Sequence, residues 1–301
     1  MKNNILITGA SGLVGTRLTE LLLNKGYSVS HLGRSKENRL VETFTWDIDK
    51  FTVEEGALEN INTIIHLAGA GVADKRWTPH RKQEILESRT KSSALLFKEL
   101  KNGNHHVESF ISASAIGYYG FDDNETLLTE QSAPGDDFLA QVTKKWEDEV
   151  DQISTLGIRV VKLRIGIVLS QKGGALKEMA LPIKLFAGSP LGTGNQNLSW
   201  IHLDDLCNMF IKAVEDNKLS GPYNATGPYP VTNRNMINAI AKTLHKPLFL
   251  PAVPGFVLQI ILGKMADVVL NGSKVSSEKI QQTGFKFQFL NLEEALNDLL
   301  N

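Results

Sequence analysis

The chain has 301 residues, 42% of them hydrophobic, and a formal net charge of -1 from 32 basic and 33 acidic residues. This length can bury a sizeable core in one large domain or two moderate ones. The balanced charge gives no net field to attract nucleic acid or an anionic membrane, so neither is expected as a partner. Cys207 is the single cysteine, which excludes an intramolecular disulfide and fits a reducing, cytoplasmic location.

The first apolar segment runs directly into a glycine-rich sequence. Residues 4–8 read as a buried strand and residues 16–24 as a helix. Between them Gly9 permits a tight turn, Gly12 lets the backbone approach phosphates, and Gly15 allows close helix packing. The sequence therefore predicts a cradle for a dinucleotide pyrophosphate, with a glycine turn that binds nothing as the alternative. The expected contacts are Gly9, Ser11, Gly12, Leu13, Val14 and Gly15.

Strand-like runs then alternate with helical stretches through the first two thirds of the chain. We expect strands at 4–8, 28–32, 63–67, 109–112 and 160–164, and helices that include 78–97 and 136–156. This alternation predicts an α/β fold, a Rossmann-type doubly wound parallel sheet covered by helices on both faces.

The alternation of strands and helices ends after residue 173, where glycine-rich loops appear. A stretch with several prolines follows at 247–254. Residues 256–270 read as one apolar helix and residues 292–300 as a short amphipathic helix. We expect a dinucleotide-binding domain over 1–246, which includes substrate loops at 170–230. A small, mainly helical module would occupy 247–301 and act as a substrate or lid lobe.

The end of the second strand indicates which cofactor is bound. Arg34 stands where a form that binds NAD would carry an acidic residue, and its guanidinium suits a 2′-phosphate. NADP(H) is therefore favoured over NAD(H), with Gly33 and Ser35 beside Arg34; a solvated surface arginine is the alternative. Asp47, after the next short strand, is either an acceptor for the adenine amino group or an ordinary turn aspartate.

Several segments in order carry a resemblance that runs nearly end to end. They are residues 66–70 (HLAGA), 74–77 (DKRW), 88–89, 114–120 (SAIGYYG), 146–147 (WE), 173–176 (GGAL), 200–205 (WIHLDD) and 221–225 (GPYNA). On these motifs the chain resembles the extended short-chain dehydrogenase/reductase (SDR) superfamily. More narrowly, it resembles an atypical, epimerase-like subgroup of the NAD-dependent epimerase/dehydratase proteins that ends in a small module of the DUF1731 type.

The resemblance implies further contacts to the cofactor. Leu67, Ala68 and Gly69 would line the ribose, Glu84 and Arg89 would reach the cofactor from the long helix, and Val168 would face the nicotinamide. Ser112 and Arg164 are also candidates. Arg89 has the alternative of a solvated helix face, and Arg164 that of anchoring a carboxylate of the protein itself.

The superfamily transfers protons with a tyrosine and a lysine four residues apart on one helix. Counting back from Glu147, these positions hold Leu139 and Thr143, which cannot take over that role. The substitute candidates are Ser114, Tyr118 and Tyr119, and a nearby cationic nicotinamide would lower a tyrosine pKa. The alternative is that the tyrosines form an aromatic lid.

His202 invites an acid/base interpretation, but a structural turn in which an aspartate caps the next helix is favoured. No metal is expected. The leading hypothesis is an NADP(H)-dependent oxidoreductase or epimerase-like enzyme that acts on a small polar substrate, with a homodimer as the candidate assembly. The competing hypothesis is a catalytically silent NADPH-binding protein that senses redox state or binds a partner.

Overall fold

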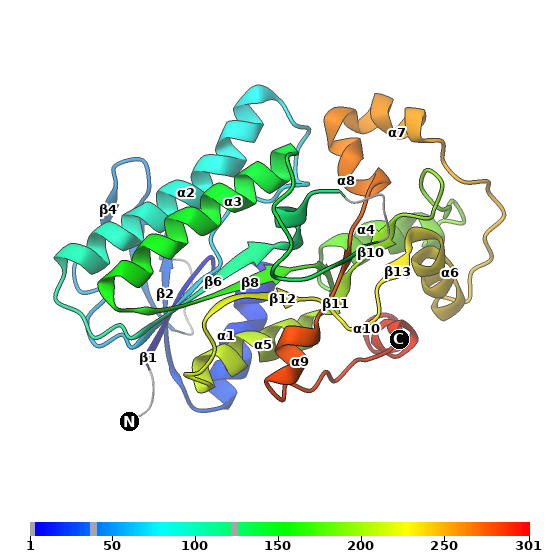
Figure 1. Cartoon of the computed structure of the whole chain (residues 1–301). Helices are drawn as coiled ribbons and strands as arrows, with labels where there is room; N and C mark the ends of the chain where they lie inside the picture. Colours follow the sequence, from blue (N-terminus) through cyan, green and yellow to red (C-terminus); the bar gives the residue numbers. More distant parts are fainter. Residues whose placement is uncertain (1–3, 37–40, 122–125) are drawn as a thin grey trace.

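A largely parallel sheet forms the centre of the molecule in this computed structural model (Figure 1). The structure describes residues 4–36, 41–121 and 126–301. The strand order is β12-β8-β6-β5-β1-β2-β3-β4, and all neighbours are parallel except β3 and β4. The strands are β1 (Asn4–Thr8), β2 (Ser28–Gly33), β3 (Glu42–Asp47), β4 (Thr52–Val53), β5 (Thr63–His66), β6 (Ser109–Ala115), β8 (Arg159–Ile165) and β12 (Gly221–Ala225).

Two pairs of helices cover the faces of the sheet (Figure 1). Helices α1 (Leu13–Asn24) and α5 (Leu203–Glu215) pack on one face, and α2 (Pro79–Asn102) and α3 (Phe138–Gln152) on the other. Local sequence fixes their starts: the Thr78 side chain accepts from the backbone of Arg81, and Asp137 does the same for the first turn of α3. The buried apolar residues of strands and helices form one core, in which Ile5, Leu6 and Ile7 of β1 are fully buried.

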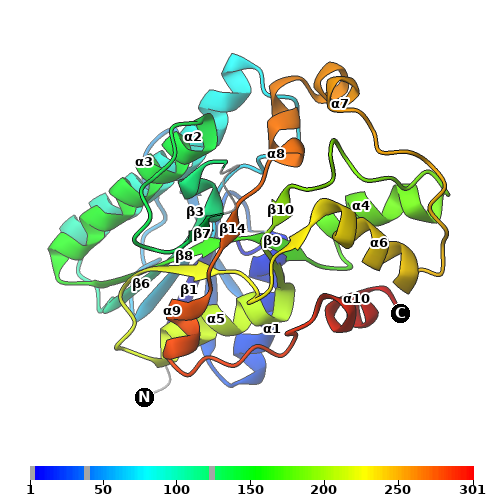
Figure 2. The same ribbon diagram turned by 45° about the vertical axis from the view of Figure 1, so that its right-hand side comes forward.

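A second, smaller core lies beside the sheet. It joins α4 (Ala175–Lys184), α6 (Asn233–Thr243) and α10 (Leu292–Leu300) around the buried Trp200, and Figure 2 shows these three helices close together. The short strands pair as β9 (Ile167–Leu169) with β11 (Trp200–His202) and β10 (Asn197–Leu198) with β13 (Val231–Thr232).

The C-terminal part is tied into the rest of the chain. Strand β14 (Lys274–Val275) pairs with β7 (Leu127–Leu128), and α9 (Glu278–Gln282) follows it. The Ser199 hydroxyl donates to the carbonyl of Ser273 (2.8 Å) and accepts from the backbone of Val275 (3.0 Å). The Ser273 hydroxyl donates to the carbonyl of Gly120 (2.6 Å). At Gly272 a Cβ would stand 1.9 Å from a backbone oxygen of Asn197, so the segment passes very close to the main body.

The predicted fold class is confirmed, whereas one predicted helix is wrong and one strand of the sheet was missed. Residues 256–270 form not one helix but α7 (Gly255–Leu262), a 3-10 turn at Gly263–Ala266 and α8 (Asp267–Leu270). The break falls at Gly263, whose φ of 61° does not continue a helix. Strand β12 was not predicted, although it pairs with β8 along its whole length. The domain boundary at residue 246 remains a prediction.

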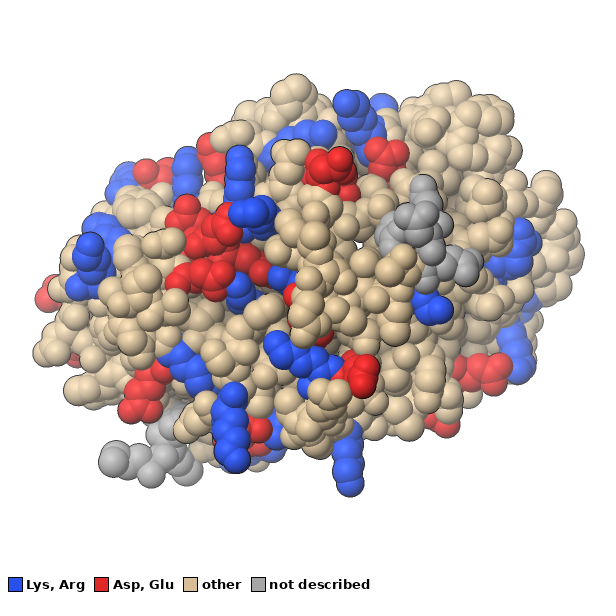
Figure 3. Space-filling model, in the orientation of Figure 1, with Lys and Arg blue, Asp and Glu red and all other residues tan. Residues whose placement is uncertain are grey.

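Charged side chains are unevenly spread over the surface. On the face seen in Figure 3, basic and acidic residues are interspersed over most of the molecule, while the region at the upper right, which carries α7, shows few of them. Of the helices in the described ranges, none combines the length and apolar character needed to cross a membrane.

Candidate functional site

The glycine-rich turn joins β1 to α1 with almost no free space around it. Gly9 has a φ of 66°, and a Cβ there would stand 2.8 Å from the backbone nitrogen of Ala68. A Cβ at Gly15 would lie 2.6 Å from the carbonyl oxygen of Gly9, so both positions require glycine. Gly12 precedes α1 without capping it through a side chain, which leaves backbone N–H groups of the first turn available to an anion.

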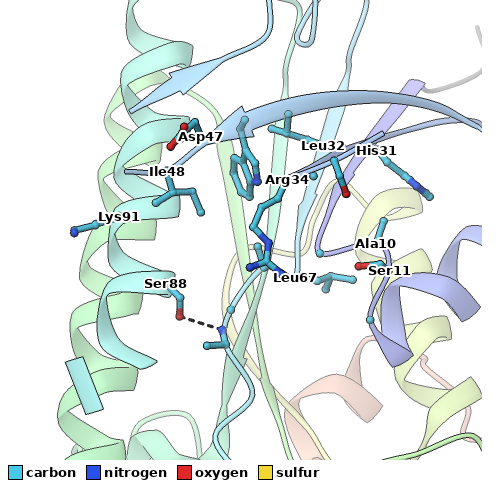
Figure 4. A pocket seen from close by; sticks show the side chains of 18 of the residues that line it. Ala10, Ser11, His31, Leu32, Arg34, Asp47, Ile48, Leu67, Ser88 and Lys91 are labelled. Carbon is cyan, nitrogen blue, oxygen red and sulfur yellow. Dashed lines mark hydrogen bonds between the residues drawn. The ribbon is translucent and has the colours of Figure 1, made fainter. Parts of the chain in front are cut away.

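A pocket of about 770 Å³ opens at the carboxyl ends of β1, β2, β3 and β5 (Figure 4). Parallel sheets bind ligands at this edge, and the volume is typical of ligand sites. The lining residues are 9–12 of the turn, 31–35 at the end of β2, Thr43 and 46–49 around β3, 67–70 after β5, and Glu84, Glu87, Ser88 and Lys91 of α2. The pocket thus gathers Gly9, Ser11 and Gly12 of the predicted cradle with Gly33, Arg34 and Ser35.

Arg34 extends from the end of β2 into this pocket, toward Leu67 (Figure 4). Its side chain is exposed, and no carboxylate of the described residues lies within ion-pair distance of it. The neighbouring Lys36, in contrast, pairs with Glu54 at 2.5 Å. The Arg34 guanidinium therefore lies inside the pocket, where none of the described acidic residues pairs with it.

Asp47 ends β3 at the rim of the same pocket, but its carboxylate is engaged. It accepts from the backbone of Asp49 (3.1 Å) and of Lys50 (2.9 Å), and its other oxygen lies 3.2 Å from the Lys50 ammonium. These bonds from Lys50 lower the pKa of Asp47. The structure therefore shows Asp47 holding a turn, and its contact with the adenine amino group remains a prediction.

The loop that follows β5 is held in place by a buried histidine. The Thr8 hydroxyl oxygen accepts from the backbone N–H groups of Leu67 and Ala68 (both 3.2 Å), so its proton points to Nδ1 of His66 at 2.8 Å. Nε2 of His66 then carries the ring proton and donates to Ser92 (3.2 Å). Burial lowers the pKa of His66 to about 3, so the ring stays neutral and fixes the loop that lines the pocket.

Arg89 supports the same loop from below. It donates to the carbonyl of Ala70 at 3.0 Å, and a Cβ at Gly69 would stand 3.1 Å from its guanidinium carbon. Burial, followed by repulsion from Arg81, lowers the pKa of Arg89 to about 10. Arg89 is thus not part of a solvated helix face, although it does not line the pocket itself. Glu84 does line the pocket and pairs with Arg81 at 2.7 Å.

Ser114 and Arg164 meet in a buried ion-pair network instead of facing the pocket. Arg164 binds both oxygens of Glu147, at 2.8 and 2.9 Å, and the Ser114 hydroxyl donates to the same carboxylate at 2.6 Å. Burial raises the pKa of Glu147, but the hydrogen bond and charge of Arg164, the charge of Lys162 and the hydrogen bond from Ser114 together outweigh it, and the net shift is downward. Arg164 therefore anchors a carboxylate of the protein itself, and the proton of Ser114 is directed to Glu147. Ser112 is fully buried and bonds to the carbonyl of Ala113.

The two tyrosines differ in how free their hydroxyl groups are. The Tyr119 hydroxyl donates to Asn224 (2.6 Å) and accepts from Arg164 (2.9 Å). Burial raises the pKa of Tyr119 to about 12. The lowering of a tyrosine pKa by a bound cationic nicotinamide remains a prediction. The Tyr118 ring is half-buried and stacks against Arg164, whose guanidinium carbon lies 3.5 Å from the ring centroid. Within the described chain, no hydrogen bond engages the Tyr118 hydroxyl.

The positions of the missing proton-transfer pair keep the expected geometry. A Cβ at Gly117, just after β6, would stand 3.5 Å from Cβ of Leu139 and 3.7 Å from the Thr143 hydroxyl. The Thr143 hydroxyl donates to the carbonyl of Leu139 at 2.8 Å. Lys144 is exposed and pairs with Asp148 (2.7 Å), so it does not replace the absent lysine. Leu139 and Thr143 thus lie together beside Gly117, and their correspondence to the superfamily's tyrosine and lysine positions remains a prediction.

Other predicted residues lie near the pocket without lining it. Leu13 and Val14 form the first turn of α1, and Val168 lies in β9. A Cβ at Gly174 would contact both Leu13 (3.6 Å) and the carbonyl of Val168 (3.7 Å), so these residues adjoin at the start of α4.

His202 has a structural role, as favoured, but the capping residue is the histidine and not an aspartate. Nδ1 of His202 accepts from the backbone of Asp204 (3.1 Å) at the start of α5, and its ring stacks on Phe289 at 3.8 Å.

Several pocket residues were not predicted, among them Thr43, Trp46, Ser88 and Lys91. Ser88 accepts a hydrogen bond from the backbone of Ala70 at 3.0 Å (Figure 4). Trp46 directly precedes Asp47 in β3, so treating the whole end of that strand as part of the edge would have found it.

The comparisons with known proteins agree with this geometry. The family model described as "NAD dependent epimerase/dehydratase family" matches residues 5–226, and "Domain of unknown function (DUF1731)" matches residues 253–299. The epimerase family protein YfhF of Bacillus subtilis (strain 168) is 36% identical over 300 residues, which covers 99% of this chain and 98% of that protein. The epimerase family protein SAR0825 of Staphylococcus aureus (strain MRSA252) is 36% identical over 299 residues, with 98% of both proteins covered.

Solved structures extend the comparison. The human epimerase family protein SDR39U1 with NADPH superposes with a TM-score of 0.89 at 29% identity, covering 98% of each chain. A nucleoside-diphosphate sugar epimerase from Corynebacterium glutamicum gives a TM-score of 0.81 at 30% identity, covering all of this chain and 58% of the other. Thermus thermophilus UDP-glucose 4-epimerase with NAD, at 18% identity, a TM-score of 0.76 and 98% and 97% coverage, shares the fold. The chain therefore belongs to the NAD dependent epimerase/dehydratase family and ends in a DUF1731 domain.

Proposed function

We propose that this protein binds NADP(H) in the pocket at the carboxyl ends of β1, β2, β3 and β5. The observation that carries this proposal is Arg34, a guanidinium inside the pocket with no acidic partner among the described residues. The open N-terminus of α1 suits the pyrophosphate, and Arg34 suits the 2′-phosphate, to which it can donate two parallel hydrogen bonds. The NADPH bound to the human relative supports the same cofactor class.

Calorimetry with NADPH and NADH tests this proposal. We expect NADPH to bind the protein more tightly, and Arg34→Ala to weaken NADPH binding about 10- to 100-fold because it removes a charge-assisted contact worth roughly 1.5–3 kcal/mol. Binding of NADH should change little. Lys36→Ala is the matched control, because that neighbouring cation already pairs with Glu54. Equal affinity for both cofactors, or an equal loss for both in Arg34→Ala, would reject the proposal.

The proposed activity is that of an oxidoreductase or epimerase-like enzyme acting on a small polar substrate. A bound nicotinamide would supply or accept the hydride. Of the three candidate residues, Tyr118 is the best suited to move a proton, because Ser114 and Tyr119 are committed to buried partners. Tyr118 follows β6 in the segment that faces Leu139 and Thr143, where the superfamily keeps its acid and base.

Oxidation of NADPH in the presence of a broad panel of carbonyl compounds tests for the oxidoreductase activity, and formation of an epimer from nucleotide sugars tests for the redox-neutral epimerase activity. Tyr118→Phe should abolish turnover while NADPH still binds, because the change removes only the hydroxyl group. Leu128→Ala, which lies away from the pocket, serves as the control. Turnover that survives in Tyr118→Phe would exclude Tyr118 as the acid or base.

A specific observation also favours a second function, that of a catalytically silent NADPH-binding protein. Leu139 and Thr143 cannot transfer a proton in the required way, and Ser114 is bound to Glu147. Tight NADPH binding together with no turnover across the panel would support this redox-sensing or partner-binding role.

A further inference from the structure

Exposed large apolar side chains are concentrated on one side of the molecule. The described residues contain 12 such side chains. Eight of them lie at the end of α4, at residues 249–250 between α6 and α7, or on α7, and none lies on α2 or α3. They are Leu181, Leu185, Phe186, Phe249, Leu250, Phe256, Ile260 and Ile261, each between 49% and 71% exposed. We call these eight residues the apolar edge.

The parts of the apolar edge adjoin one another. Phe186 at the end of α4 stacks on Phe249, with ring centroids 6.4 Å apart. In both ribbon views the chain from α6 to α7 runs along the same side of the molecule as the end of α4 (Figures 1 and 2). One side of the molecule thus carries a strip of apolar side chains.

Helix α7 turns its apolar residues outward. Only Leu258 is buried, while Phe256 and Ile260, four residues apart and so on one helical face, are 64% and 71% exposed. A helix that is apolar on its solvent side lacks the polar face of an ordinary surface helix. We therefore expect the exposed apolar face of α7 to be covered when the protein binds another surface.

Lysines predominate along the chain segments that carry the apolar edge. Neither residues 179–203 nor residues 245–266 contain an aspartate or glutamate, and the flanking acidic residues include Glu178, three positions before Leu181, and Asp267. Lys184 and Lys264 are exposed there, and the Lys246 ammonium lies 4.3 Å from the centroid of the Phe186 ring. The net charge of -1 for the whole chain hides this basic region, since a charged partner responds to charges within about 8–10 Å.

We propose that the apolar edge docks on an anionic lipid surface. Aromatic and aliphatic side chains would enter the headgroup boundary, and the surrounding lysines would pair with the anionic headgroups. Contact with a second copy of the chain fits less well, because a two-fold interface would bring the same excess of lysines together on both sides. The molecule would lie on the bilayer, not cross it.

Flotation with vesicles tests the proposal. The full-length protein should float with phosphatidylcholine vesicles that contain about 30% phosphatidylglycerol and should remain unbound with pure phosphatidylcholine. Phe256→Ser combined with Ile260→Ser should lower the partition coefficient at least about tenfold. Lys246→Gln combined with Lys264→Gln should lower it as well, and roughly 0.5 M salt should weaken binding of the wild type.

Leu23→Ser is the matched control, because this exposed leucine lies on α1, away from the apolar edge. It should float as the wild type does, and unfolding midpoints will show that each variant is folded. A wild-type protein that stays unbound with anionic vesicles would overturn the proposal. So would a wild-type dimer in light scattering that the Phe256 and Ile260 changes convert to a monomer, without vesicle binding, since a second copy would then cover the apolar edge.

Discussion

Glu147→Gln removes the only carboxylate that Arg164 contacts in the described structure, and we expect it to cost about 3–5 kcal/mol of unfolding free energy. Glu147 and Arg164 are buried, and their bonds of 2.8 and 2.9 Å keep both ions compensated. Glutamine keeps the size of the side chain but leaves Arg164 without a counter-charge, whereas the buried Lys162, 3.4 Å from Glu147, keeps its partner Asp151 at 2.6 Å. Because folded proteins have only about 5–15 kcal/mol in total, this loss should be easy to measure.

A double-mutant cycle measured by urea unfolding provides the assay. Arg164→Met alone should also be destabilising, because it leaves the Glu147 carboxylate buried. The variant that combines Glu147→Gln with Arg164→Met should lose less than the sum of the two single variants, by about 1–3 kcal/mol. Additive losses, or a cost below about 1 kcal/mol for Glu147→Gln, would refute the view that this pair is a tightly coupled buried unit.

The same pair predicts a pH dependence of stability. The pKa of Glu147 is lowered in the folded protein, so the charged carboxylate stabilises the fold above its unfolded pKa of about 4.3. This contribution is lost as the pH falls through the folded pKa. The unfolding free energy of the wild type should therefore drop below about pH 4.3 more steeply than that of Glu147→Gln.

Three further predictions concern single residues. Gly15→Ala should abolish NADPH binding in calorimetry, since its Cβ would stand 2.6 Å from backbone atoms; retained affinity would show that the turn can adapt. His66 should stay neutral with its proton on Nε2 in NMR spectra between about pH 5 and 8, because burial lowers its pKa to about 3, and a titration in that range would contradict the hydrogen-bond assignment. Cys207 should react with a thiol reagent only as the protein unfolds, because burial raises its pKa; fast labelling of the folded protein would disprove its burial.

Local sequence predicted the features that depend on local backbone geometry. The glycine spacing from Gly9 to Gly15 fixes a turn within a few residues, and Arg34 follows its strand directly. Both could be read without knowing which strands are neighbours. The alternation of strands and helices likewise predicted the sheet, because each crossover occupies one continuous stretch of chain.

The roles of the catalytic candidates could not be read in this way. Ser114 and Arg164 meet at Glu147 only because β6 pairs with β8 and α3 packs beside them, and the residues involved are 17 to 33 positions apart. Tyr119 likewise meets Asn224 only across the unpredicted strand β12. A side chain that looks available for chemistry in the sequence can be committed by a partner that only the tertiary structure supplies.

The passage of the chain at Gly272 also bears on the order in which the protein is made. Ser199 and Gly120 receive their partners Ser273 and Val275 only after nearly the whole chain has been synthesised. During synthesis on the ribosome, the Ser199 hydroxyl and the Gly120 carbonyl therefore stay hydrogen-bonded to water until the last residues emerge. Shortened chains that end before residue 272 should accumulate as incompletely closed species that proteases recognise, however complete their nucleotide cradle is.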